Sequence, residues 1–213
     1  REATPSSQAP PTDRSDVEVV VRRDEGIAAA RNAGIEAAST DKIMFLDDDA
    51  IPATGFVDAA IEALEEFSVV AGRVVQPTPS VNPGIDYDHG GEPTVVEDIV
   101  GCNMAMRRQA FETAGYFNPV FDWGYEETEW CTRARAQGYE VHYAPKMLAM
   151  HSFEPTRLEH WKKQYWRGKS ESYIWCLKGD PATKRLIRSG PLNVTREDTA
   201  QTIGRIAEKL GRV

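Results

Sequence analysis

Short apolar runs alternate with amphipathic stretches along most of the chain. The runs predict buried strands, which cover residues 17–22, 42–46, 69–75, 102–108 and 139–145. The last of these strands is expected to stop at Pro145. Helical spacing of apolar residues predicts helices from Gly26, over 55–67 and over 126–137. Strands that alternate with helices indicate an α/β fold with a mixed, mainly parallel sheet flanked by helices.

The remaining segments divide the chain into three parts. Residues 1–16 are rich in proline, serine, threonine and charge, which is typical of a mobile tail. Residues 17–152 are the predicted α/β core, and within them the proline- and glycine-rich stretch 76–98 is expected to be a long surface excursion. Residues 153–213 have a helical pattern that predicts a C-terminal extension.

Composition narrows the class of protein. A net charge of −8 over 213 residues argues against a general nucleic-acid binder. The three cysteines lack the spacing of a metal site, so we expect free thiols in a reducing compartment. No apolar run approaches the roughly 20 residues that a membrane-spanning helix needs. These features predict a cytoplasmic protein.

Three consecutive aspartates, Asp47, Asp48 and Asp49, follow the predicted strand 42–46. Adjacent carboxylates repel one another and lose hydration on burial unless a positive charge neutralises them. Ligands of open parallel sheets bind at the carboxyl ends of the strands, which is where these side chains lie. Oxygen ligands favour Mg²⁺ or Mn²⁺, held together with substrate phosphates. The alternative is a solvated loop in which one aspartate caps the helix that begins near Thr54.

Two stretches, "GIAAARNAGIEAASTDKIMFLDDDAIP" from Gly26 and "GCNMAMRRQAFETAGYFNPVFDWGYEETEWCTRARAQGYEVHYAPKMLAMH" from Gly101, resemble the inverting GT-A glycosyltransferases of family 2. The likeness covers residues 17–151, and its specificity lies in the order and spacing of the blocks. It implies a GT-A-like, Rossmann-related fold and an enzyme that uses Mn²⁺ or Mg²⁺. Such an enzyme moves a sugar, with inversion, from a nucleotide-diphosphate donor to an acceptor hydroxyl on a carbohydrate, a lipid or a protein.

The resemblance also implies the donor side of a site. The family's metal motif falls on Asp47 and Asp49, and His151 matches a histidine that is a metal ligand in many relatives. The remaining donor-binding positions fall on five residues: Arg31, Asp48, Cys102, Asn103 and Trp123. For Asn103 and Cys102, packing in a strand is an equal explanation, and for Trp123 packing in the core is the simpler one.

The resemblance places the catalytic base on Glu127 and the acid before it on Glu126. A carboxylate there can accept the proton of the acceptor hydroxyl. The family usually has aspartate at the base position, so the extra methylene of Glu127 is a departure, and Glu129 is an alternative base. All three acids open a helix, where negative charge is favourable without any catalytic role.

Residues 157–178 combine aromatic and basic side chains in a helical stretch. Such a mixture is typical of a helix that lies on an anionic membrane surface or contacts a diphosphate. The alternative, which we favour from the sequence, is a helix whose aromatic residues face the core and whose lysines face water.

Relatives begin with strands that bind the nucleotide base, and here the tail 1–16 stands in their place. We therefore expect a processed or truncated start and a further segment, from the same gene product or from a partner protomer, that pairs with the sheet beside 42–46.

Two other functions would also explain part of the sequence pattern. One is a non-catalytic glycosyltransferase-like binding module, or an incomplete fragment that needs a partner segment. The other is a metal-dependent phosphate-ester enzyme, which explains the aspartates but not the pair Glu126 and Glu127.

Overall fold

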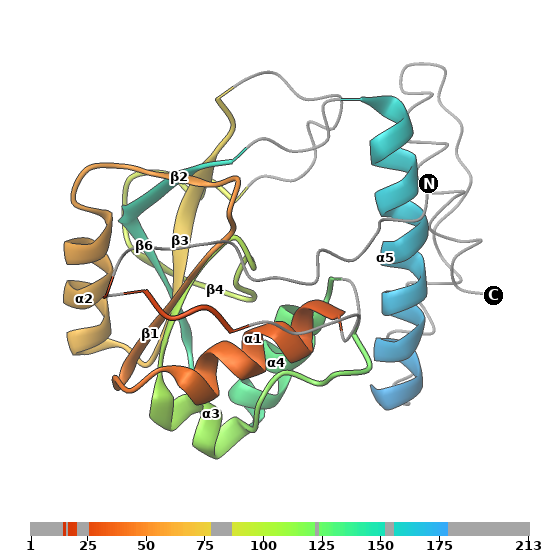
Figure 1. The fold of residues 1–213 in the computed structure, drawn as a ribbon, viewed down its shortest axis with the longest axis horizontal. Helices are drawn as coiled ribbons and strands as arrows, with labels where there is room; N and C mark the ends of the chain where they lie inside the picture. Colours follow the sequence, from red (N-terminus) through yellow and green to blue (C-terminus); the bar gives the residue numbers. More distant parts are fainter. Residues whose placement is uncertain are drawn as a thin grey trace.

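A six-stranded mixed sheet forms the centre of the structure (Figure 1). The computed structural model describes residues 15, 17–20, 26–77, 87–121, 124–151 and 156–178. The strands are β1 (Lys42–Leu46), β2 (Ile51–Pro52), β3 (Val69–Val75), β4 (Thr94–Val96), β5 (Asn103–Arg107) and β6 (Val141–Met150). Their order across the sheet is β1-β5-β3-β6-β2, and β4 also pairs with β6.

Helices cover both faces of this sheet (Figure 1). They are α1 (Gly26–Ala37), α2 (Phe56–Glu66), α3 (Arg108–Ala114), α4 (Glu126–Ala136) and α5 (Arg157–Lys178). Helices α1, α3 and α4 share a core with one face, where Trp130 packs between Phe111 and Phe117, and α2 packs its residues Phe56 and Leu64 against the other. Helix α5 stands outside these two layers. Among the described helices, none has the length and apolar content to cross a bilayer.

The expected mixed α/β class is confirmed, but the sheet is not mainly parallel. Within the described strands, only β3 and β6 pair in parallel, and the other four pairings are antiparallel. Since β5 runs against both β1 and β3, the strands β1, β3 and β6 all point the same way. Their carboxyl ends therefore meet at one edge of the sheet, as the sequence led us to expect.

Most of the predicted elements are confirmed, but one predicted strand is wrong and one helix was not expected. Residues 17–20 form no strand and their valines are exposed, while 21–22 lie outside the described residues. No described strand pairs with this apolar run. Helix α3 was not expected, because the sequence shows only a strand running into two arginines. The part of the predicted C-terminal extension that follows residue 178 lies outside the described residues and stays a prediction.

Strand β6 passes through Pro145, where the sequence predicted its end. The pairing of β3 with β6 shifts between Gly72 and Arg73: Gly72 lies opposite Ala144 and Arg73 opposite Leu148. Pro145 thus lies in a bulge, where no ladder hydrogen bond is needed from its missing N–H.

The side chain of Asn103 stabilises this bulge. Asn103 is fully buried, and its Nδ2 donates to the backbone oxygens of Arg73 and Met147, each at 2.9 Å. One of these carbonyls belongs to β3 and the other to the unpaired stretch of β6 at the shift in register. A buried carbonyl without a partner costs about 1–3 kcal/mol, so one amide group stabilises both strands.

Strand β1 lies at the end of the described sheet. Its described partner is β5, and no described strand pairs with its other edge. The further segment expected beside residues 42–46 stays a prediction.

Gly72→Ala is expected to destabilise the fold. A Cβ at Gly72 would lie 2.2–2.3 Å from the amide atoms of Asn103, so it would displace that side chain from both carbonyls. We expect a loss of about 2–4 kcal/mol in the free energy of unfolding, measured by urea denaturation. Gly34→Ala is the matched control, because nothing lies within 4 Å of a Cβ there and alanine favours a helix. Equal stability of the two variants would contradict the role given to Asn103.

Candidate functional site

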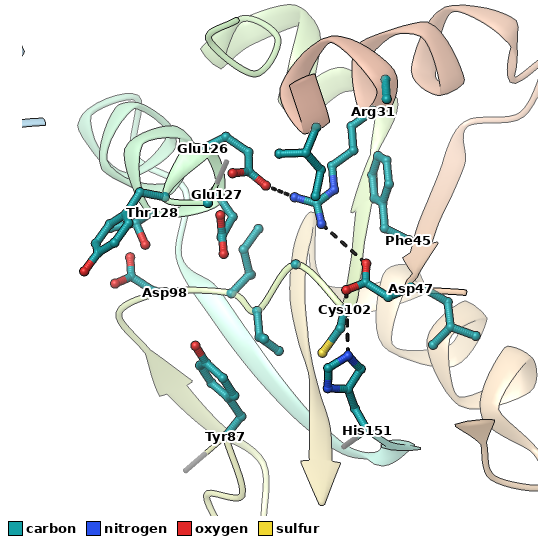
Figure 2. A pocket seen from close by; sticks show the side chains of 18 of the residues that line it. Arg31, Phe45, Asp47, Tyr87, Asp98, Cys102, Glu126, Glu127, Thr128 and His151 are labelled. Atoms are coloured by element: carbon teal, nitrogen blue, oxygen red, sulfur yellow. Dashed lines mark hydrogen bonds and ion pairs between the residues drawn. The ribbon is translucent and has the colours of Figure 1, made fainter. Parts of the chain in front are cut away.

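A pocket opens at the edge where the carboxyl ends of β1, β3 and β6 meet. Asp47 directly follows β1, His151 directly follows β6, and Cys102 directly precedes the antiparallel strand β5. The first turn of α4 adds Glu126 and Glu127. Figure 2 shows these side chains pointing toward a common space. The sequence segments that carry the expected site residues are therefore brought together by the topology of the sheet.

Three expected metal ligands converge in this pocket. The Nε2 of His151 lies 3.1 Å from Oδ1 of Asp49 and 4.0 Å from Oδ2 of Asp47. Carboxylate oxygens and an imidazole nitrogen are ligands that suit Mn²⁺ and Mg²⁺ sites. The backbone holds this geometry: Ala50 N donates to Asp47 O at 3.0 Å and closes the aspartate turn. The residues present fit a divalent cation.

Cys102 lies in the same cluster as Asp47 and His151, with ligand atoms within 4.8 Å of one another. Burial, with a smaller contribution from the charge of Asp47, raises the pKa of the Cys102 thiol to about 12. Mn²⁺ and Mg²⁺ prefer oxygen and nitrogen ligands to thiols, so Asp47 and His151 are the members of this cluster that suit them.

Arg31, from α1, connects the two halves of the pocket. Its guanidinium forms an ion pair with Glu126 and lies 3.6 Å from Oδ1 of Asp47, while only 9% of its surface is exposed (Figure 2). Gly101 leaves room for it, because a Cβ there would lie 2.5 Å from an Arg31 nitrogen. A buried cation between two carboxylates is stabilised where an isolated one would not be.

The start of α4 directs Glu126 and Glu127 into the pocket. Tyr125, at the N-cap, has a left-handed backbone with φ of 70°, a conformation that non-glycine residues rarely adopt. Such backbone strain persists only where the surrounding structure imposes it, and it is common at functional sites. Both carboxylates line the pocket, and Glu126 is 1% exposed.

The environment of Glu126 favours its protonated form. Burial and then the neighbouring Glu127 carboxylate raise the pKa of Glu126 to about 8, and the opposing attraction of Arg31 is smaller. Two adjacent carboxyl groups in a low-dielectric pocket do not readily carry two negative charges.

The far wall of the pocket contains residues that sequence reasoning did not identify. It includes Tyr87 and Asp98 from the segment before β5, and Lys163 and Arg167 from α5. Burial raises the pKa of Tyr87 to about 12, an effect that the nearby Arg167 partly opposes. Tyr87 and Asp98 carry no sequence signal, because the segment 76–98 shows no periodicity. Lys163 and Arg167 were visible only as part of a basic helix.

Two residues considered from the sequence stand apart from the pocket, and the structure does not describe a third. The side-chain amide of Asn103 donates hydrogen bonds to backbone oxygens at the bulge between β3 and β6. This side chain does not line the cavity. Glu129, the alternative base, accepts two hydrogen bonds from Arg133 at 2.8 and 2.9 Å and does not line the cavity either. Trp123 lies outside the described residues.

Comparisons with known proteins agree on one family. The model described as glycosyl transferase family 2 matches residues 6–115, and the model described as N-terminal domain of galactosyltransferase matches residues 84–160. Glycosyltransferase AglE of Haloferax volcanii is 29% identical over 163 residues, which cover 72% of this chain and 53% of AglE. The pre-mycofactocin glycosyltransferase of Mycobacterium tuberculosis is 27% identical over 193 residues, covering 82% of this chain and 40% of that protein. The chain thus spans about half, or less, of the length of these relatives.

A solved structure shares the fold. The mannosyltransferase PcManGT from Pyrobaculum calidifontis, solved in complex with GDP-Man and Mn²⁺, aligns with a TM-score of 0.55 and 21% identity. The alignment covers 92% of this chain and 53% of PcManGT.

The raised pKa of Glu126 predicts a pH-dependent stability. The native state holds a proton that an unfolded glutamate releases near pH 4.5, so this stabilisation is complete below about pH 4.5 and is lost as pH rises through about 8. Relative to Glu126→Gln, the wild-type free energy of unfolding should fall by about 1.4 kcal/mol per pH unit at the steepest part of this window. Urea titrations from pH 5 to pH 8 measure the difference, and parallel profiles for the two proteins would show that Glu126 is ionised throughout.

Proposed function

Because the chain belongs to glycosyl transferase family 2, we propose that it transfers a sugar from a nucleotide-diphosphate donor to an acceptor hydroxyl, with inversion at the sugar carbon. The observation that carries this proposal is the placement of Asp47, Asp49 and His151 in the same pocket as Glu127. The first three residues suit the binding of a metal–diphosphate complex, and Glu127 suits the role of the catalytic base. The expected family and the GT-A-like fold are both confirmed.

The donor diphosphate is proposed to bind at the end of the pocket formed by Asp47, Asp49 and His151. A divalent cation bound there, Mn²⁺ or Mg²⁺, would neutralise the charge that develops on the departing diphosphate. Asp48 also lines this end, and Arg31 orients Asp47 through their ion pair. The Mn²⁺ and GDP-Man in the PcManGT structure support this assignment as an analogy within one fold.

Glu127 is proposed to accept the proton of the acceptor hydroxyl. Its carboxylate lines the pocket next to Glu126, whose environment favours the neutral, protonated form. A neutral Glu126 can donate to its neighbour and leaves Glu127 as the proton acceptor of the pair. Glu129 is the less suitable base, because its carboxylate is paired with Arg133 and does not line the pocket.

Lys163 and Arg167 are proposed to complete the pocket electrostatically. They lie one turn apart on α5 and line the wall that also holds Asp98 and Glu127. Positive side chains there offset the repulsion among the carboxylates and attract an anionic donor.

Nucleoside diphosphate should stabilise the chain only when a divalent cation is present. At 100 times the dissociation constant, binding adds about 2.7 kcal/mol, or roughly 5–10 °C in Tm for a chain of this size. Thermal scans with UDP or GDP in Mn²⁺ and in EDTA measure this shift. Asp49→Asn should abolish most of it, whereas Asp58→Asn, on α2, should not. A shift that is equal in Mn²⁺ and EDTA would exclude a metal-dependent donor site.

Glu127→Gln should separate binding from chemistry. The variant keeps the size and polarity of the side chain but cannot accept a proton, so donor-induced stabilisation should persist while transfer falls by about 10² or more. The measurement is release of nucleoside diphosphate in a screen of nucleotide sugars and acceptors with Mn²⁺.

Glu129→Gln is the matched control for this experiment, because its carboxylate lies outside the pocket and its turnover should stay at the wild-type level. A fully active Glu127→Gln variant would refute the assignment of the base. Donor binding without turnover in the wild-type chain would instead favour the non-catalytic binding module.

A further inference from the structure

Helix α5 is amphipathic in the sense opposite to that of a core helix. Its side chains that face the rest of the molecule include His160 and Gln164, which are 4% and 8% exposed. Leu158, Tyr165 and Trp166 are 59%, 48% and 42% exposed, whereas Trp161 is half-buried. The expectation that the aromatic residues of this helix face the core is therefore wrong for Tyr165 and Trp166. Polar side chains, and not these two aromatic rings, occupy the inward face of the helix.

The exposed residues form one continuous stripe. Leu158, Lys162, Tyr165 and Trp166 are spaced by four, seven and eight residues from the first, which places them on one side of a helix. The rings of Tyr165 and Trp166 contact each other edge to face, with centroids 5.6 Å apart. We call these four residues the outer face of α5. Scattered exposed apolar residues need no explanation, but a grouped stripe indicates a surface that is covered by a partner.

The basic residues of α5 indicate that a partner of the outer face carries negative charge. Residues 157–178 contain six basic and two acidic residues, in a chain whose net charge is −8. Arg157 and Lys162 are exposed next to the apolar side chains. The nearby acid, Glu159, accepts a hydrogen bond at 2.7 Å from the Thr156 hydroxyl in a capping box at the helix start. Arg157 and Lys162 thus place positive charge beside the exposed aromatic rings of this helix.

We propose that the outer face of α5 binds an anionic lipid surface. Tryptophan and tyrosine favour the headgroup region of a bilayer, where the ring is buried and the polar edge stays hydrated. Lysine and arginine extend their charged ends toward anionic headgroups while their methylene chains lie on apolar surface. A helix with both features lies in the plane of the interface, and its binding strength depends on anionic lipid. A protein partner would have to supply acidic groups between apolar pockets, whereas anionic lipid offers both without a defined shape.

This inference does not depend on the proposed transfer reaction, because its test measures binding only. The chain is mixed with large vesicles of phosphatidylcholine containing about a third phosphatidylserine, or of phosphatidylcholine alone, and sedimented. We expect binding to the anionic vesicles that weakens in high salt, and little binding to the neutral ones.

Two variants test the two components of the outer face. Tyr165→Ala combined with Trp166→Ala should lower the partition coefficient by about tenfold or more, because two rings no longer enter the interface. Lys162→Glu should lower it by a similar factor, since each basic charge near the surface contributes about fivefold. All three side chains are exposed, so Tm should change little, which a thermal scan checks.

Matched controls lie on other surfaces. Tyr116→Ala removes an aromatic residue of similar exposure, and Lys146→Glu reverses a charge that is 78% exposed. Neither should change vesicle binding.

Several results would overturn the proposal. These are no binding to anionic vesicles, equal binding to both kinds of vesicle, or equal losses in the controls. If instead the chain self-associates with rising concentration and the double variant does not, the outer face covers a second copy rather than lipid.

Discussion

The buried guanidinium of Arg31 is the constraint on which the site depends. It binds Glu126 at the start of α4 and Asp47 at the end of β1, segments that are about 80 residues apart in the sequence. A guanidinium at this depth needs polar partners, because an unpaired buried charge costs several kcal/mol, and Glu126 and Asp47 are the two acidic groups that it meets. The spacing of the two halves of the pocket is therefore set by one side chain. Gly101 is part of the same arrangement, since any side chain there would take the space of the guanidinium.

This arrangement leaves the pocket short of positive charge. The acidic residues that line it are Asp47, Asp48, Asp49, Asp98, Glu126 and Glu127. The described basic residues that line it are Arg31, Lys163 and Arg167. The protein reduces the imbalance at one end by keeping Glu126 close to neutral. At the other end Asp47 and Asp49 face His151, and a bound divalent cation would offset their negative charge. In the reaction we propose, an anionic donor would bind such an acidic pocket through a metal ion rather than against the protein's own charge.

Much of this could be predicted from the sequence because the signals are local. An apolar run that ends in three aspartates predicts both β1 and its exposed end, and Val69–Val75 was predicted with its bounds. The errors arose where a distant partner decides the outcome. Pro145 is accepted inside β6 because β3 shifts its register opposite, and Asn103 is buried because it caps that shift. Antiparallel pairing of β5 could not be derived either, since a strand's direction depends on its connection and not on its own residues.

Helix α5 shows how a polar site can direct the polar face of a helix inward and its apolar side chains outward. A helix that packs on a hydrophobic core presents its apolar side chains inward, and the sequence favoured that arrangement. Here the surface that α5 meets is an acidic pocket, which calls for Lys163 and Arg167 on the inward face. Once the polar side is directed inward, the geometry of the helix directs Leu158, Tyr165 and Trp166 outward. The exposed apolar stripe is thus a consequence of the inward-facing basic residues. The pocket and the outer face of α5 are accordingly linked, because any rotation of the helix that buries the aromatic rings also withdraws the two basic side chains from the pocket.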